Sequence, residues 1–150
     1  MKNLRTTAAF VGAAVALALV MVAPARAADP LGTWLTEDKD GKIRIVNCGG
    51  AICGNLVWLK VPNDPKTHQP KLDENNKDVS KQTRPLLGIP IVLGMKPNGT
   101  PDQWEGKVYN SKDGNTYSGS FTMTGANSAV LKGCIMGGLL CKGQTWTRSN

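Results

Sequence analysis

The segment formed by residues 131–148 constrains the fold of this chain more than any other part. It reads LKGCIMGGLLCKGQTWTR and contains two cysteines, four glycines and a terminal Trp146-Thr147-Arg148. Each cysteine needs a partner, and the tryptophan and arginine need surfaces to pack against. Because glycines permit a sharp reversal between the cysteines, we expect this segment to be a closing hairpin.

The four cysteines form two close pairs in the sequence, Cys48 with Cys53 and Cys134 with Cys141. Four cysteines allow three pairings, and the local pairing is the simplest because each pair flanks glycines. Neither pair has the C-x-x-C spacing typical of zinc sites or redox sites. We therefore expect two structural disulfides, each contributing about 2–3 kcal/mol to stability, in an oxidising compartment.

Residues 1–27 have the pattern of a secretory signal peptide. Lys2 and Arg5 precede the apolar residues 8–23, and small residues at Ala25 and Ala27 end the segment. The alternative, a transmembrane anchor, would need a longer apolar run. We expect a periplasmic or secreted protein with no transmembrane anchor after processing. Cleavage would leave a single domain, residues 28–150, and would lower the formal charge from +7 to +4.

The rest of the chain predicts strands and almost no helix. Residues 116–124 show the clearest alternation, with Tyr117, Phe121 and Met123 on one face and serine or threonine on the other. About eight such runs are separated by turn signals, which predicts an all-β, antiparallel fold. A small β-barrel is our first expectation and a β-sandwich is the runner-up. The expected strands begin near Trp34 and continue at 42–47, 52–60, 91–95, 103–110, 116–124, 128–135 and 142–148.

The two ends of the domain favour the barrel. Gly32-Thr33-Trp34 on the first strand and Arg148 on the last resemble lipocalin-type barrels, in which a basic side chain of the final strand packs on the tryptophan. A guanidinium over an indole face would stabilise barrel closure by about 0.5–2 kcal/mol. An ordinary core role for Trp34 and an ordinary surface role for Arg148 fit the same residues.

One set of residues is spread over nearly the whole domain: Gly32-Thr33-Trp34, Cys48, Cys53-Gly54, Arg84-Pro85-Leu86-Leu87-Gly88, Trp104, Gly106, Tyr109, Gly114, Tyr117 and Gln144-Thr145-Trp146-Thr147-Arg148. In these residues the domain resembles a family of exported bacterial proteins catalogued as domain of unknown function 2147 (DUF2147). That resemblance implies export and a compact, mainly β domain, and it implies no particular activity.

The first functional hypothesis is a binding protein whose barrel interior holds an apolar or amphipathic small molecule. An eight-stranded barrel is just wide enough for one small ligand, and Gly106 and Gly119 would leave room inside. The same apolar residues would also serve a filled core. The expected cavity lining consists of Trp58, Ile91, Leu93, Trp104, Phe121 and Met123.

The alternative hypothesis is an envelope structural or interaction module with a filled core and no internal ligand. A monomer is expected under either hypothesis. Its working surface would be the loop 61–84 or the Arg84-Pro85 corner. The lysines of that loop are interspersed with acidic residues, so nucleic acid is not expected as a partner. The expected partner is an envelope component under this hypothesis and a small apolar ligand under the first.

The sequence offers little for catalysis. The one histidine, His68, lies in the polar loop, and Glu105 is the one acidic residue placed within a predicted strand. The glycines between 133 and 143 lack the Lys-Ser or Lys-Thr ending of a phosphate-binding loop. We therefore expect no catalytic residues, no metal site and no cofactor, and a hydrolase using Glu105 ranks last.

Overall fold

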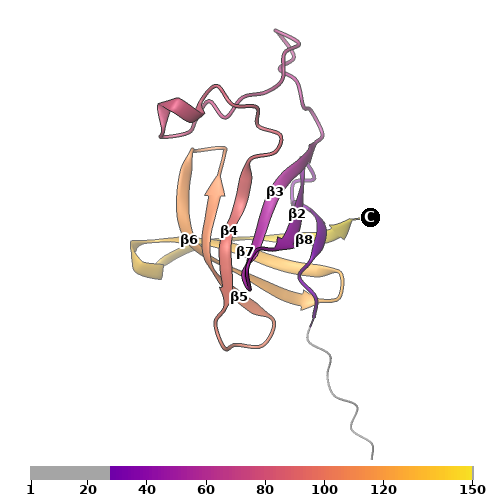
Figure 1. The fold of residues 1–150 in the computed structure, drawn as a ribbon, viewed down its shortest axis with the longest axis vertical. Helices are drawn as coiled ribbons and strands as arrows, with labels where there is room; N and C mark the ends of the chain where they lie inside the picture. The colour runs from indigo at the N-terminus through magenta and orange to yellow at the C-terminus, as the bar shows by residue number, and fades with distance from the viewer. Residues whose placement is uncertain (1–27, 150) are drawn as a thin grey trace, which may run out of the picture.

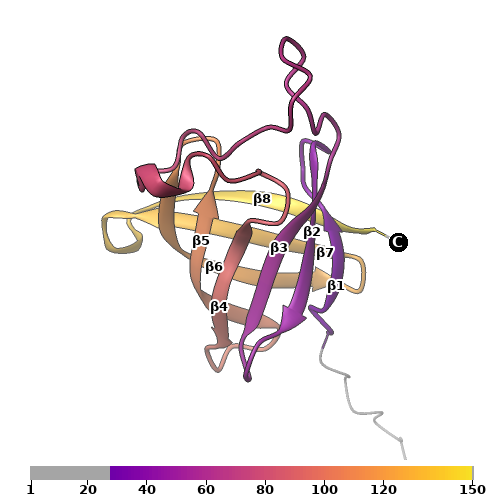
Figure 2. The same cartoon turned by 45° about the horizontal axis from the view of Figure 1, so that its top comes forward.

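The computed structural model describes residues 28–149, which form a closed barrel of antiparallel strands (Figures 1 and 2). The expected signal peptide, residues 1–27, lies outside the described residues. The strands are β1 (Gly32–Leu35), β2 (Gly41–Asn47), β3 (Ile52–Leu59), β4 (Pro90–Pro97), β5 (Gln103–Asn110), β6 (Asn115–Gly125), β7 (Ser128–Ile135) and β8 (Leu140–Ser149).

Each strand pairs with the next one in the sequence, and β8 pairs with β1 to close the barrel. Within the described residues, helix is limited to two short 3-10 turns, η1 (Val79–Lys81) and η2 (Met136–Gly138). The predicted all-β barrel is confirmed, and the β-sandwich is not the architecture. Closure removes the exposed strand edges that an open sheet of this size would leave.

Arg148 links the first and last strands of the barrel, β1 and β8. It pairs in register with Trp34, and its guanidinium lies 4.4 Å from the centre of the Trp34 ring. The guanidinium also donates hydrogen bonds to the carbonyl oxygens of Asp29, Leu31 and Ala126. Glycine suits position 32 beside it, because its φ of +123° is one that other residues rarely adopt and a Cβ there would lie 2.8 Å from the Arg148 Nη1 atom. A cation–π contact and hydrogen bonds to the backbone thus meet where β1 pairs with β8, which we call the seam of the barrel.

An aromatic cluster fills the barrel near this seam. The Phe121 ring is fully buried, and its centre lies 5.5 Å from Trp34, 6.1 Å from Trp146 and 6.3 Å from Trp104. Edge-to-face and tilted contacts of this kind stabilise a core beyond the burial of apolar area. We call these four residues the aromatic plug.

Both disulfides join neighbouring strands. Cys48–Cys53 closes the turn between β2 and β3, and Cys134–Cys141 links a directly paired position of β7 and β8. The local pairing predicted from the sequence is confirmed. The hairpin expected in residues 131–148 is the β7–β8 hairpin, with its turn at η2.

Candidate functional site

The barrel is hollow at the end away from the plug. The connections at this end are residues 36–40, 60–89, 111–114 and 136–139, since they join the strand ends that meet at one rim. A cavity of about 1180 Å³ opens between them. The loop between β3 and β4 passes across this rim in both ribbon views (Figures 1 and 2).

The inner walls of the cavity, which the strands form, are mainly apolar. Ile43, Leu56, Val108 and Leu131 are buried side chains that line it, and the indole of Trp146 lines it at the side of the plug. These residues come from five different strands, each with its inward face turned to the same space. An apolar group that enters this space would lose its contact with water, which is favourable by about 25 cal/mol per Å².

Polar and charged residues also line the cavity, most of them on the connections at the rim. Gln144 is half-buried and accepts a hydrogen bond from the Trp146 indole nitrogen at 3.2 Å. The Tyr117 hydroxyl donates to Asp113 at 2.7 Å, which raises the pKa of Tyr117 and keeps the phenol protonated. Apolar walls combined with polar groups that offer hydrogen bonds are typical of sites that orient a small ligand.

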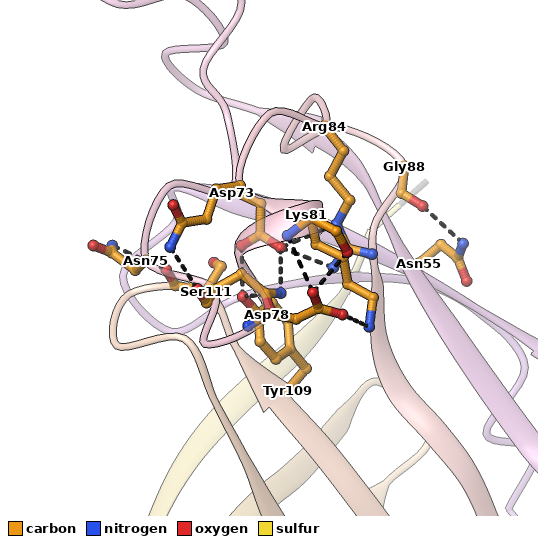
Figure 3. Close-up of polar contacts among 12 residues, drawn as sticks. Asn55, Asp73, Asn75, Asp78, Lys81, Arg84, Gly88, Tyr109 and Ser111 are labelled. Carbon is orange, nitrogen blue, oxygen red and sulfur yellow. Dashed lines mark hydrogen bonds and ion pairs between the residues drawn. The ribbon is translucent and has the colours of Figure 1, made fainter.

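The β3–β4 loop is fixed to the barrel by a buried carboxylate (Figure 3). Asp73 is fully buried and accepts hydrogen bonds from Arg84 at 2.8 and 3.0 Å, from the Tyr109 hydroxyl at 2.6 Å and from Asn76 at 2.8 Å. Tyr109 lies on β5, so this network joins the loop to the barrel wall. We call Asp73, Asn76, Arg84 and Tyr109 the loop lock.

The loop lock changes the titration of its tyrosine. Burial, and the hydrogen bond that the hydroxyl donates to Asp73, raise the pKa of Tyr109 from about 10 to about 12. The Asn76 amide donates to the same hydroxyl at 2.9 Å. Because the phenol must keep its proton to donate to Asp73, the lock is complete at neutral pH and weakens as the pH rises from 10 through 12.

A second contact seats the loop on the β5–β6 turn. The side-chain amide of Asn75 donates to the carbonyl oxygens of Ser111 and Lys112 at 3.3 and 3.2 Å. Gly114 has a φ of +72°, and a Cβ on it would overlap the Asn75 carbonyl oxygen. Only glycine fits this position, because it provides both the left-handed backbone and the close approach.

Charged residues on the β1–β2 and β5–β6 connections meet at the rim. The Lys112 amine contacts the carboxylates of Asp38 and Asp40, the latter at 3.0 Å. Partial burial opposes ionisation of Asp38, but the bonds from Lys112 and neighbouring groups prevail and lower its pKa well below the usual range. Hydrogen bonds to Asp38 and Asp40 raise the pKa of Lys112.

Lys112→Met is therefore expected to destabilise the fold in a pH-dependent way. Near neutral pH the loss in unfolding free energy should be about 1 kcal/mol or less, because these side chains are largely exposed. Because folding lowers the pKa of Asp38, the stabilisation from its charged carboxylate is complete above pH 3.8. It is lost as the pH falls through the pKa of Asp38 in the folded protein. Because folding raises the pKa of Lys112, the stabilisation from its charged amine is lost only as the pH rises above 10.5.

Chemical denaturation of both proteins from neutral to acid pH checks this. The difference between wild type and Lys112→Met should shrink below pH 3.8, whereas Lys77→Met, at an exposed loop lysine, should behave as wild type throughout. A difference that stays constant into strong acid would contradict the ion cluster.

The six residues expected to line the cavity lie in different places. Ile91 is buried and lines the cavity. Trp104 and Phe121 belong to the plug, and Met123 is buried in the same core cluster. Leu93 is half-buried against the core, and Trp58 is exposed on the outside, with the Lys42 amine 5.5 Å from its ring centre. Direct contact of these six with a ligand stays a prediction.

Reasoning from the sequence missed the loop lock. Asp73 lies in a run of polar residues that predicts a solvated loop, and Tyr109 lies on a strand that is distant in the chain. The only available signal was Arg84-Pro85 and Tyr109 among the family-like residues. His68 and Glu105 are exposed, and the described part of the chain has no cluster of three His, Cys, Asp or Glu residues arranged to hold a metal. None of the helical turns in residues 28–149 is long and apolar enough to span a bilayer.

Comparisons with known proteins agree with this architecture. The sequence profile of a family described as "Uncharacterized protein conserved in bacteria (DUF2147)" matches residues 32–148. Among solved structures, the barrel is similar to protein HP1028 of Helicobacter pylori, described as belonging to the lipocalin family. The TM-score is 0.67 at 18% identity, over 82% of this chain and 84% of that one. No curated protein sequence matches the chain.

Proposed function

The chain belongs to the bacterial DUF2147 family, and we propose that it binds an apolar or amphipathic small molecule in the open end of its barrel. The observation that carries this proposal is the cavity of about 1180 Å³ with buried apolar walls and a charged rim. A fold that needed only a filled core would bring side chains into this space, as the aromatic plug does at the other end.

The arrangement favours an amphipathic ligand with one apolar part. Ile43, Leu56, Leu131 and Ile91 would contact the apolar part, and Gln144 offers a hydrogen bond inside the cavity. Lys142 also lines the cavity and stands near its mouth, where it would attract an anionic headgroup. The likeness to a lipocalin-family protein supports the same class of function, because lipocalin barrels hold one small ligand.

The proposed setting is the periplasm or the extracellular space. Two disulfides are compatible with an oxidising compartment and are uncommon in the reducing cytoplasm. The signal-peptide pattern of residues 1–27 also supports export. In the proposal, Trp104, Phe121 and Met123 form the closed base on which the ligand-binding end is built.

Two measurements test the binding proposal. Native mass spectrometry of protein purified gently from its source is expected to show extra mass that disappears on denaturation. Titration of the ligand-free protein with N-phenylnaphthylamine should show fluorescence that saturates with a single site. Gln144→Trp places a large ring inside the cavity and should weaken probe binding by about tenfold or more, equivalent to about 1.4 kcal/mol.

Thr145→Trp is the matched control. Thr145 is the next residue of β8, is exposed, and does not line the cavity, so the same ring is added to the outer face of the same strand. Its probe affinity should equal that of wild type. Equal weakening by both variants, or no saturable binding together with a native mass equal to the processed chain, would overturn the proposal and favour an interaction module without an internal ligand.

A further inference from the structure

The tip of the β7–β8 hairpin presents an unusual apolar surface. Its six residues, 135–140, contain two glycines and four large apolar side chains. The exposed fractions are 46% for Ile135, 66% for Met136, 80% for Leu139 and 57% for Leu140. Single exposed apolar residues are ordinary, but four at one protruding turn form a patch of the kind that marks an interaction site.

The tip is built to stay exposed. The Cys134–Cys141 disulfide ties the strands together at its base, and the turn is closed by a hydrogen bond from the Leu139 amide to the Met136 carbonyl. Met136, Gly137 and Gly138 all have positive φ angles, so the backbone reverses within a few residues. Figure 2 shows the hairpin extending sideways past the neighbouring strands, so the tip stands clear of the barrel wall.

The surroundings of the tip are basic. Residues 114–150 contain no aspartate or glutamate, while Lys132 and Lys142 lie just beyond the disulfide on the two strands. Both lysines are exposed. A second copy of this chain would bring a like-charged hairpin against this one, which is unfavourable. An anionic surface with an apolar interior complements both the lysines and the tip.

We propose that residues 135–140 dock on a lipid bilayer that contains anionic headgroups. Met136 and Leu139 enter the interface between headgroups and acyl chains, and Lys132 and Lys142 contact the headgroup phosphates. Ile135 and Leu140 also line the cavity, so docking sets the cavity mouth against the lipid surface. Transfer of an amphipath between bilayer and cavity would rest on the proposed function, whereas docking itself does not.

Vesicle flotation of the processed protein tests the docking. The protein is expected to float with phosphatidylcholine vesicles that contain phosphatidylglycerol, to bind pure phosphatidylcholine vesicles much more weakly, and to be released by salt. The double variant Met136→Asn/Leu139→Ser should reduce the fraction bound by about tenfold or more, since two apolar side chains no longer enter the interface. Asparagine tolerates the positive φ of position 136.

Val79→Ser is the matched control, because Val79 on η1 is also a strongly exposed apolar residue but lies on the β3–β4 loop. It should float as wild type does. Neither tip substitution changes a residue that lines the cavity, so probe binding should be intact in the double variant, which separates docking from ligand binding.

Three results would overturn the docking proposal. These are absence of flotation at low salt, equal flotation of the tip variant and wild type, and equal binding to neutral and anionic vesicles. Self-association that is lost in the tip variant, without vesicle binding, would instead assign the patch to a second copy of the chain.

Discussion

Phe121→Ala is expected to lower the free energy of unfolding by about 3–5 kcal/mol, the range for removing a fully buried phenylalanine. Phe121 contacts Trp34, Trp104 and Trp146 at once, so the truncation leaves a cavity bordered by rigid rings that cannot easily move into it. Urea denaturation followed by tryptophan fluorescence measures the loss. An unchanged denaturant slope would show that only stability has changed.

Two variants calibrate this result. Phe121→Leu keeps an apolar group in the plug and should lose clearly less stability than Phe121→Ala. Thr122→Ala changes the next residue of β6, on its opposite face, and should cost about 1 kcal/mol or less. A loss for Phe121→Ala no larger than that for Thr122→Ala would contradict the role of the plug in holding the barrel closed.

Probe binding by a plug variant also tests whether the plug end of the barrel is distinct from the cavity end. Phe121 does not line the cavity, so Phe121→Leu should bind N-phenylnaphthylamine as wild type does. Gln144→Trp should have the opposite profile, with weakened binding and a smaller change in stability. If Phe121→Leu weakened probe binding as much as Gln144→Trp, the initial expectation that Phe121 contacts the ligand would hold and the division of the barrel would be wrong.

The barrel was predictable because its strands are encoded locally. Alternation in β6 placed Phe121 and Met123 on the inner face, and both are buried. Turn signals such as Asn98-Gly99 and Asp113-Gly114 separate the strands, and Cys134 and Cys141 are close enough in the sequence to indicate their own pairing. These signals act over a few residues, so one sequence suffices to find them.

The position of the cavity was not predictable in the same way. Alternation shows which side chains point inward, but it does not show at what height along the barrel they lie. Trp104 and Ile91 both lie on strands of the barrel, yet one packs in the plug and the other lines the open end. Height depends on the stagger between strands, which is set by pairings and bulges that a single sequence does not display.

The loop lock was missed for a related reason. Asp73 and Tyr109 are 36 residues apart, and nothing near either residue indicates the other. A carboxylate among lysines and asparagines predicts solvent exposure, whereas here tertiary contacts bury it. The charge is tolerated because every buried polar side-chain atom in the described residues has a hydrogen-bond partner.

Asp73→Asn is expected to have the second large effect, a loss of about 3 kcal/mol in the free energy of unfolding. Removing one partner of a buried ion pair leaves the other without compensation, which costs about 3–5 kcal/mol, and the partial exposure of Arg84 places the value at the low end. An amide keeps the shape of the carboxylate but cannot accept from Arg84 and Tyr109 with the same strength.

Three measurements together identify the lock as the cause. Chemical denaturation gives the stability, and limited proteolysis should cleave residues 61–84 faster in the variant because the loop leaves the barrel more often. Ultraviolet titration of the phenolate should place the pKa of Tyr109 near 12 in wild type and closer to 10 in Asp73→Asn.

Asp78→Asn is the control, since Asp78 lies in the same loop but is exposed and pairs with Lys81. It should leave the Tyr109 titration unchanged and cost little stability. If Asp73→Asn were as stable and protease-resistant as wild type, the loop would be held by other contacts, chiefly those of Asn75 with the β5–β6 turn. Because this loop crosses the rim of the cavity, its release should also speed exchange of a bound probe, which ties the buried carboxylate to access to the site.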